Sequence, residues 1–392
     1  MKKVLKRGLT LTFIALGLLG CSSEEDTIVM SPLPIVKSQF TPKTLWTASV
    51  GDGVGHYFSK LSPVYAYNKV FVASRDGEVK ALDPETGKTL WEADLGEDEP
   101  ARLSGGLSAL YDKVYVGSEN GQVYALSADD GSLVWQQDIE GEVLAKPLAD
   151  ENLVMFNTAK GSLVALKQES GEQAWVINNE VPNLTLRGDS SPTSVSGGVF
   201  WGMSNGRLAA ALIQKGQLLW QQPIGTPKGS TEIDRLVDVD ASPLIIGSSL
   251  YTVGINGQLV AIDLRSGTPM WKRAYSSATD LATDGSKLFV VTDQDHLTGV
   301  DVRSGTKLWE NDELQYRQLS EPAVIHNYLV VGDNEGYLHW IDRNTGAFVA
   351  QQLIGDDDDD DGIAVAPIQL DDGFIVITRE GEIKKMQIPE GS

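Results

Sequence analysis

The chain has 392 residues, of which 41% are hydrophobic, and its 54 acidic residues against 32 basic ones give a net charge of −22. This acidity argues against binding to nucleic acid or to anionic lipid headgroups, because both are negatively charged. The chain contains one cysteine, which excludes a disulfide within the chain.

Residues 1–20 have the pattern of a signal peptide. Four basic residues precede an apolar stretch, residues 9–19, that is too short to span a membrane as a helix. The segment ends in Leu-Leu-Gly-Cys, which resembles a bacterial lipobox, so we expect cleavage before Cys21 and lipidation of that residue. The alternative is an ordinary secretory signal with an unrelated cysteine. Ser22 follows the cysteine, and in lipoproteins of this type that residue implies sorting to the outer membrane.

Residues 21–39 are polar and include prolines, and we expect them to form a flexible tether behind the lipid. Removal of the signal peptide removes four positive charges and no negative ones, so the mature chain would carry a net charge of −26. Such a chain favours a protein partner that is met through a local, less acidic surface.

An eleven-residue motif, ALDPETGKTLW at residues 81–91, recurs through residues 40–389. Its final position is Trp46 in a partial first copy and Ala350 in the last, and the spacing between copies varies from 38 to 51 residues. A period in this range predicts a β-propeller or a repeat array. A glycine stands four residues before the final position from the second copy onward, as expected for a left-handed turn that only glycine adopts without strain.

Eight hairpin patterns accompany the motif, each with an apolar run, a polar turn and an alternating run. The last hairpin, at residues 374–388, has no strand after it, whereas the strand around Trp46 has no hairpin before it. We therefore predict an all-β, eight-bladed β-propeller of four-stranded antiparallel blades, closed by pairing the N-terminal strand with the C-terminal hairpin. The motif tryptophans are expected to wedge between neighbouring blades.

Two connections between blades are unusually long, residues 176–192 and residues 221–243. They precede consecutive blades, so we expect them to lie side by side on one face. Their candidate binding residues are Leu184, Leu186, Arg187, Asp238 and Asp240. Exposed leucines beside an arginine would supply apolar area and a planar cation to a protein partner. In the alternative interpretation the leucines cover the channel mouth and the arginine pairs with one of the aspartates.

The repeat also resembles the tryptophan-docking motif of the quinoprotein dehydrogenases, eight-bladed enzymes that hold pyrroloquinoline quinone over calcium. These enzymes close the cofactor site with adjacent cysteines, which one cysteine cannot supply, and no convergent set of ligands is evident. We therefore predict no catalytic residue, cofactor or metal, and treat a periplasmic dehydrogenase or a decayed, ligand-binding relative as the alternative. Trp201 and Trp340 lie inside hairpins and are expected in the core.

The remaining polar signals are weak. The four histidines are isolated in sequence, without metal-ligand spacing, and we expect each on the surface or in a turn: His56, His296, His326 and His339. Six consecutive aspartates, Asp356 to Asp361, predict a solvated loop, with calcium binding as the alternative.

Together, the lipobox with Cys21, the absence of other cysteines, and the segments NLTLRGDSSP at Asn183 and RLVDVDASP at Arg235 resemble the BamB family of outer-membrane protein assembly factors. The resemblance implies a non-catalytic lipoprotein on the periplasmic side of the outer membrane of a Gram-negative bacterium. It also implies binding to the POTRA domains of BamA within the β-barrel assembly complex, through Leu184, Leu186, Arg187, Asp238 and Asp240. Exposed blade edges are a secondary candidate site for unfolded outer-membrane proteins.

Overall fold

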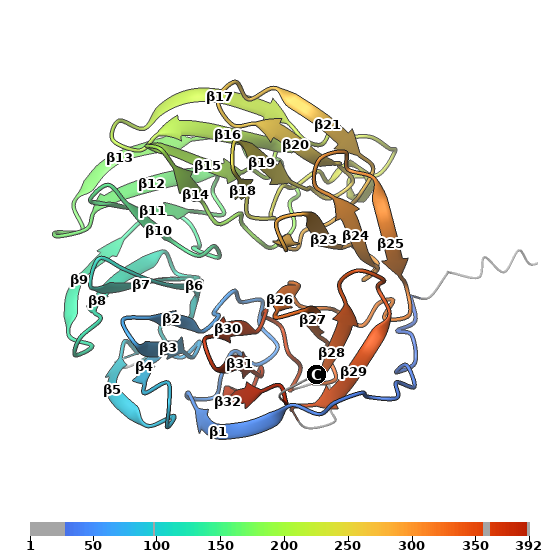
Figure 1. Cartoon of the computed structure of the whole chain (residues 1–392). Coiled ribbons are helices and arrows are strands. Elements are labelled where there is room, and N and C mark those ends of the chain that lie inside the picture. Colours follow the sequence, from blue (N-terminus) through green and yellow to red (C-terminus); the bar gives the residue numbers. More distant parts are fainter. Residues whose placement is uncertain (1–27, 97–98, 356–360, 390–392) are drawn as a thin grey trace, which may run out of the picture.

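The computed structural model describes residues 28–96, 99–355 and 361–389. Within these ranges, strands form eight four-stranded antiparallel sheets arranged as a ring (Figure 1), which confirms the predicted eight-bladed propeller. The described ranges hold one short helical turn, η1 (Ile233–Arg235), and no helix in them has the length and apolarity to cross a bilayer. The predicted signal peptide and Cys21 lie outside the described residues.

In blades 1 to 7 the four strands follow one another in chain order, with the first strand innermost and the last at the rim, whereas in blade 8 the rim strand comes from the N-terminus (Figure 1). Blades 1 and 2 contain β2 (Val64–Ala66), β3 (Lys69–Ala73), β4 (Glu78–Leu82), β5 (Thr89–Asp94), β6 (Leu103–Leu110), β7 (Lys113–Ser118), β8 (Gln122–Ser127) and β9 (Leu133–Asp138). Blades 3 and 4 contain β10 (Leu148–Asp150), β11 (Leu153–Asn157), β12 (Ser162–Lys167), β13 (Gln173–Asn178), β14 (Thr193–Val195), β15 (Gly198–Gly202), β16 (Arg207–Leu212) and β17 (Gln217–Pro223).

The second half of the ring repeats this arrangement. Blades 5 and 6 contain β18 (Leu244–Ile246), β19 (Ser249–Thr252), β20 (Leu259–Asp263), β21 (Pro269–Arg273), β22 (Ala282–Thr283), β23 (Lys287–Val291), β24 (Leu297–Asp301) and β25 (Lys307–Asn311). Blades 7 and 8 contain β26 (Ala323–Ile325), β27 (Tyr328–Gly332), β28 (Tyr337–Asp342), β29 (Phe348–Leu353), β30 (Ile368–Leu370), β31 (Gly373–Ile377), β32 (Glu382–Gln387) and the N-terminal strand β1 (Lys43–Ser49).

The ring is closed by the two ends of the chain. β1 pairs antiparallel with β32, from Lys43 opposite Gln387 to Ser49 opposite Glu382, with a register shift between Thr44 and Trp46. β1 thus supplies the outermost strand of blade 8, as predicted. Without this pairing, the edge of β32 would be left unpaired and β1 would belong to no sheet.

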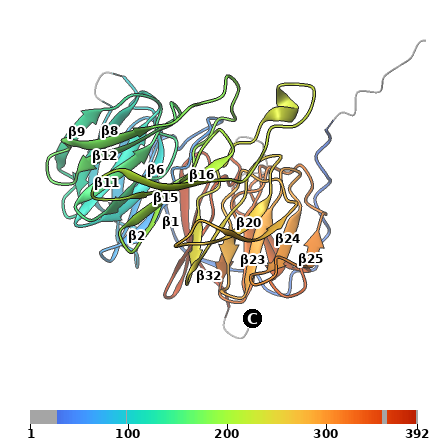
Figure 2. The same ribbon diagram turned by 90° about the horizontal axis from the view of Figure 1, so that it is seen from above.

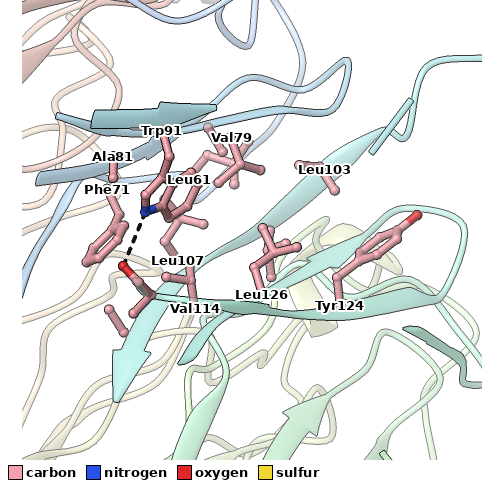
Figure 3. Close-up of a cluster of buried hydrophobic side chains, with 14 of the residues drawn as sticks. Leu61, Phe71, Val79, Ala81, Trp91, Leu103, Leu107, Val114, Tyr124 and Leu126 are labelled. Atoms are coloured by element: carbon pink, nitrogen blue, oxygen red, sulfur yellow. Dashed lines mark hydrogen bonds between the residues drawn. The ribbon is translucent and has the colours of Figure 1, made fainter. Parts of the chain in front are cut away.

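In every blade except blade 7, a motif tryptophan packs against the next blade, which confirms the predicted role of these residues. Trp91 of blade 1 donates a hydrogen bond of 3.2 Å from Nε1 to the carbonyl of Ala128 in blade 2 (Figure 3). Its indole also lies against Gly131, where a Cβ would come within 2.5 Å of Cε3. The motif glycine is therefore required twice, by its φ of 75° and by the ring that covers it. Equivalent bonds are made by Trp46, Trp135, Trp175, Trp271 and Trp309.

Blade 7 has Ala350 where the other blades have the motif tryptophan. The junction between blades 7 and 8 is filled instead by Phe40, whose ring centroid lies 5.6 Å from that of Trp340. Trp340 in turn lies 5.1 Å from Phe374 of blade 8. Trp340 and Trp201 are both fully buried, as predicted, so these aromatic side chains belong to the core.

The described part of the expected tether, residues 28–39, follows the outside of blade 7 (Figure 1). The backbone N–H of Ser31 donates to Gln315 O at 2.9 Å, and that of Gln39 donates to Val349 O at 2.9 Å. Arg317, whose side chain is 1% exposed, donates from Nη1 to the carbonyl of Ser31 at 3.0 Å. The segment before β1 is thus bound to the ring at both of its ends.

The expectation for the histidines is wrong at one position. His56 and His326 are exposed, but His339 is fully buried, and its Nε2 lies 2.8 Å from Oδ2 of Asp333. Arg317 donates to the same oxygen at 2.8 Å. Although burial acts in the opposite direction, these two neighbours hold the pKa of Asp333 below its usual range. The alternating strand pattern around His339 gave no sign of this buried carboxylate partner.

Candidate partner-binding site

The two long connections lie side by side on one face of the ring, as predicted (Figure 2). They run from β13 to β14, residues 179–192, and from β17 to β18, residues 224–243, and we call them the paired loops. The backbone N–H of Leu186 donates to Oδ1 of Asp238 at 3.1 Å. At Gly188 a Cβ would lie 3.0 Å from Oδ2 of Asp240, so a larger side chain there would push the loops apart.

The paired loops expose apolar side chains. Leu184 is 43% exposed and Leu186 is half-buried, while Val181 and Ile233 are also exposed. Ile233 belongs to η1, which projects beyond the blades on the same face (Figure 2). A group of exposed apolar residues with a polar border is typical of a protein-binding surface.

Arg187 is fixed between two glutamates at the edge of this surface. Its Nη2 lies 3.3 Å from Oε1 of Glu119, and its Nη1 lies 3.2 Å from Oε2 of Glu142. The alternative interpretation that Arg187 pairs with Asp238 or Asp240 is therefore wrong. Its side chain remains 46% exposed, so Arg187 is held by the two glutamates and still reaches solvent.

Asp238 and Asp240 lie beneath the surface, with exposed fractions of 1% and 5%. Burial raises the pKa of Asp238 to about 6. Burial and the charge of Asp238 raise the pKa of Asp240 to about 7. All five predicted residues therefore come together, but only Leu184, Leu186 and Arg187 reach solvent, while the aspartates support the loops from below.

A cluster of charged residues around Lys60 lies next to the paired loops. Nζ of Lys60 lies 3.3 Å from the carbonyls of Asp189 and Asp240, and 3.9 Å from Oδ1 of Asp280. Burial opposes its charge, but the surrounding carboxylates, with Asp280 first, raise the pKa of Lys60. In the described ranges no group of three His, Cys, Asp or Glu residues is arranged to hold a metal ion.

The aspartate run is described only at Asp361, and its other residues lie outside the described ranges. Asp361 is 4% exposed, and its Oδ1 accepts a hydrogen bond of 3.3 Å from the backbone N–H of Glu380. This end of the run is therefore packed against blade 8, contrary to the expectation of a solvated loop.

Glu119 and Glu142 were not identified from the sequence. Glu119 lies in the β7–β8 turn of blade 2, and Glu142 lies in the β9–β10 connection between blades 2 and 3. Propeller symmetry places turns of this kind on the face that carries the paired loops. The pattern gave no means of selecting these two carboxylates among the many acidic residues of the chain.

The closed ring and its interblade tryptophans define the class, an eight-bladed propeller of the quinoprotein-like type, here with irregular loops gathered on one face. A family model described as outer membrane protein assembly factor BamB matches residues 38–98, 75–311 and 278–391. The chain belongs to the BamB family of outer membrane protein assembly factors. It is thus a member of a family of assembly factors and not an enzyme, as predicted.

Relatives with that family name match over their whole length. The protein from Vibrio cholerae is 67% identical over 390 residues, which cover 100% of both chains. The protein from Escherichia coli is 41% identical over 389 residues, which cover 98% of each chain. The crystal structure of BamB from Moraxella catarrhalis has a TM-score of 0.79 at 24% identity, and the match covers 88% of this chain and 100% of that one.

The quinoprotein enzymes share the fold alone. Quinohemoprotein alcohol dehydrogenase from Comamonas testosteroni has a TM-score of 0.67 at 14% identity, over 88% of this chain and 76% of that one. At this identity the likeness carries no information about activity.

Proposed function

We propose that this chain is a lipid-anchored scaffold of the β-barrel assembly machinery that binds the POTRA domains of BamA through the paired loops. In this role it aids the folding and insertion of outer-membrane β-barrel proteins without catalysing a reaction. The observation that carries the proposal is the exposed surface of Leu184, Leu186 and Arg187, held in place by two glutamates and a buried aspartate.

The geometry suits binding because the surface is organised before a partner arrives. Arg187 is already oriented by Glu119 and Glu142, so little side-chain freedom remains to be lost on association. The hydrogen bond from the backbone N–H of Leu186 to Asp238 fixes the loop that carries the two leucines to the ring. A rigid ring that presents such a surface would narrow the orientations available to a flexible chain of partner domains.

The proposed anchor is Cys21, which would hold the ring on the periplasmic side of the outer membrane. Ser31 is hydrogen-bonded to the ring, and the nine residues 22–30 separate it from Cys21. Fully extended, they reach roughly 35 Å. The ring would therefore stay close to the membrane that receives the assembled barrels.

Blade edges support a second, subordinate proposal. The rim strands expose apolar side chains directly before the motif tryptophans, among them Leu45, Leu90, Val134, Leu219, Met270 and Leu308. An unfolded outer-membrane protein could add a strand at such an edge. Cross-links from these positions to an unfolded barrel protein would support this role, and their absence at all rim positions would contradict it.

A pull-down with the soluble POTRA domains of BamA tests the main proposal. Leu186→Ala and Arg187→Ala should each reduce capture, and Leu90→Ala is the matched control because Leu90 is 50% exposed on the rim of blade 1. Undiminished capture by both loop variants, with unchanged thermal unfolding, would remove the paired loops from the binding site.

A further inference from the structure

A third segment lies beside the paired loops, the connection between β1 and β2. Tyr57 in this connection is 55% exposed and Phe58 is 37% exposed. A Cβ at Gly188 would lie 3.6 Å from Cζ of Phe58, so the aromatic ring is next to the first paired loop. Two adjacent aromatic side chains therefore extend the apolar surface beyond the leucines.

Tyr57 is linked to Arg187 through two charged residues. The guanidinium carbon of Arg75 lies 3.6 Å from the ring centroid of Tyr57, in cation–π geometry. Arg75 also donates to both carboxylate oxygens of Glu119, at 2.9 Å and 3.3 Å. Glu119 is the same residue that holds Arg187. The β1–β2 connection, which we call the aromatic segment, and the first paired loop are therefore both held through Glu119.

The backbone of the aromatic segment is also fixed. Nη1 of Arg379 donates to the carbonyls of Gly55 and Tyr57 at 2.9 Å and 3.3 Å. The N–H groups of Val54 and Gly55 donate to the carbonyl of Arg379 at 2.8 Å and 3.0 Å. Gly53, at a φ of 63°, lies so close to this carbonyl that a Cβ would clash with it. The aromatic side chains are therefore presented by an ordered backbone, so little backbone freedom would be lost on binding.

A hollow of about 340 Å³ lies between the aromatic segment and the paired loops. Phe58 and Leu186 contribute apolar walls, and Lys60, Asp240 and Glu321 line its charged part. Nζ of Lys60 is already close to backbone carbonyls and to Asp280, so it does not require an added anion. The apolar walls formed by Phe58 and Leu186 are therefore available for contact with an apolar side chain of a partner.

We infer that Tyr57 and Phe58 form a third contact of the partner-binding surface, and that the hollow between Phe58 and Leu186 receives an apolar side chain projecting from the partner domain. This inference rests on the proposed function and names a part of the partner's surface. Ordered aromatic side chains beside an arginine are the composition of interface hot spots. The net charge of −22 disfavours an anionic membrane as the occupant instead.

Binding of the soluble POTRA domains to the full chain tests the inference. Tyr57→Ala and Phe58→Ala should each weaken binding at least about fivefold, a loss typical of contributing interface residues. Tyr57→Phe keeps the ring and should bind within about twofold of wild type. Tyr65→Ala is the matched control, since Tyr65 is 39% exposed and its hydroxyl donates to Oδ1 of Asn68 in the β2–β3 turn at 3.3 Å.

A cross-linking measurement guards against a folding defect in the alanine variants. A photoreactive phenylalanine analogue in place of Phe58 should cross-link to the POTRA domains, whereas the same analogue in place of Tyr65 should not. Absence of a cross-link at position 58, or wild-type affinity in both aromatic variants, overturns the inference.

The outcomes for the two proposals are separable. Wild-type affinity in Tyr57→Ala and Phe58→Ala with weakened Leu186→Ala overturns the inference and leaves the proposed function standing. Weakened aromatic variants with unaffected Leu186→Ala and Arg187→Ala support the aromatic contact and contradict the paired loops. No binding by the wild-type chain overturns both.

Discussion

The backbone N–H of Leu186 donates a hydrogen bond of 3.1 Å to Oδ1 of Asp238, which joins two connections 52 residues apart in the chain. Asp238 is 1% exposed, so the carboxylate acts from inside the ring on a loop at its surface. Substitutions at Asp238 should therefore affect binding through loop position, and substitutions at Leu186 should affect it through contact.

Asp238→Ala should weaken partner binding and lower the free energy of unfolding by roughly 1 to 3 kcal/mol, because the N–H of Leu186 loses its acceptor. Asp238→Asn keeps an oxygen at the same place and should retain most of both properties. Affinity and urea unfolding of the two variants check this. Equal loss of binding in both variants would instead assign the effect to the charge.

Arg187→Lys should weaken partner binding about tenfold, which corresponds to about 1.4 kcal/mol. One ammonium group cannot reproduce the two separate contacts that the guanidinium makes with Glu119 and Glu142. Stability should change by less than about 1 kcal/mol, as for other surface ion pairs. Lys160→Ala is the control because its pair with Glu140 is exposed on both sides. Wild-type affinity in Arg187→Lys would show that charge alone is sufficient.

Trp91→Ala should lower the free energy of unfolding by about 3 to 5 kcal/mol, since it removes a buried ring and leaves a void between blades 1 and 2 (Figure 3). The neighbouring Leu90 is 50% exposed, and Leu90→Ala should change stability by less than about 0.5 kcal/mol. Equilibrium denaturation of both variants gives the comparison. Similar small effects would mean that the interblade tryptophans do not hold the ring together.

Stability should fall as the pH rises from about 5 to about 7.5, in part through Asp240, whose pKa burial and Asp238 raise to about 7. The folded chain then holds a proton that the unfolded chain, with an ordinary carboxyl pKa, has released, so higher pH favours unfolding. Each unit of pKa difference corresponds to roughly 1.4 kcal/mol. Asp240→Asn should show a shallower fall when urea unfolding is measured at both pH values. Parallel pH profiles for wild type and variant would exclude Asp240 as the source.

The fold could be predicted because the same local sequence pattern recurs along the chain. Most copies of the motif supply a glycine for the turn and an aromatic residue for the next blade. A copy that departs from the pattern can therefore still be recognised by comparison with the others. Closure followed from unmatched strands at the two ends. The packing of Phe40 at the junction where blade 7 has Ala350 could not be predicted. The two residues are 310 positions apart in the chain, and Phe40 is not part of any repeat.

The candidate site could be placed from the sequence, but its interactions could not. Symmetry put the paired loops on one face, yet the partners of Arg187 come from the β7–β8 turn and the β9–β10 connection, outside these loops. Burial of Asp238 and Asp240 depends on how the two loops pack, which spacing along the chain does not determine. Tyr57 and Phe58 could not be identified as site residues, because they follow a glycine-rich segment that does not recur in the other blades.

Amide hydrogen exchange of the full chain, with and without the soluble POTRA domains of BamA, tests the central claim most directly because it locates the contact without altering it. The account predicts new protection at residues 183–188 and in the adjoining part of the second paired loop, with none at the β2–β3 and β6–β7 turns on the opposite face. Protection confined to those turns, with unchanged exchange in the paired loops, would contradict it.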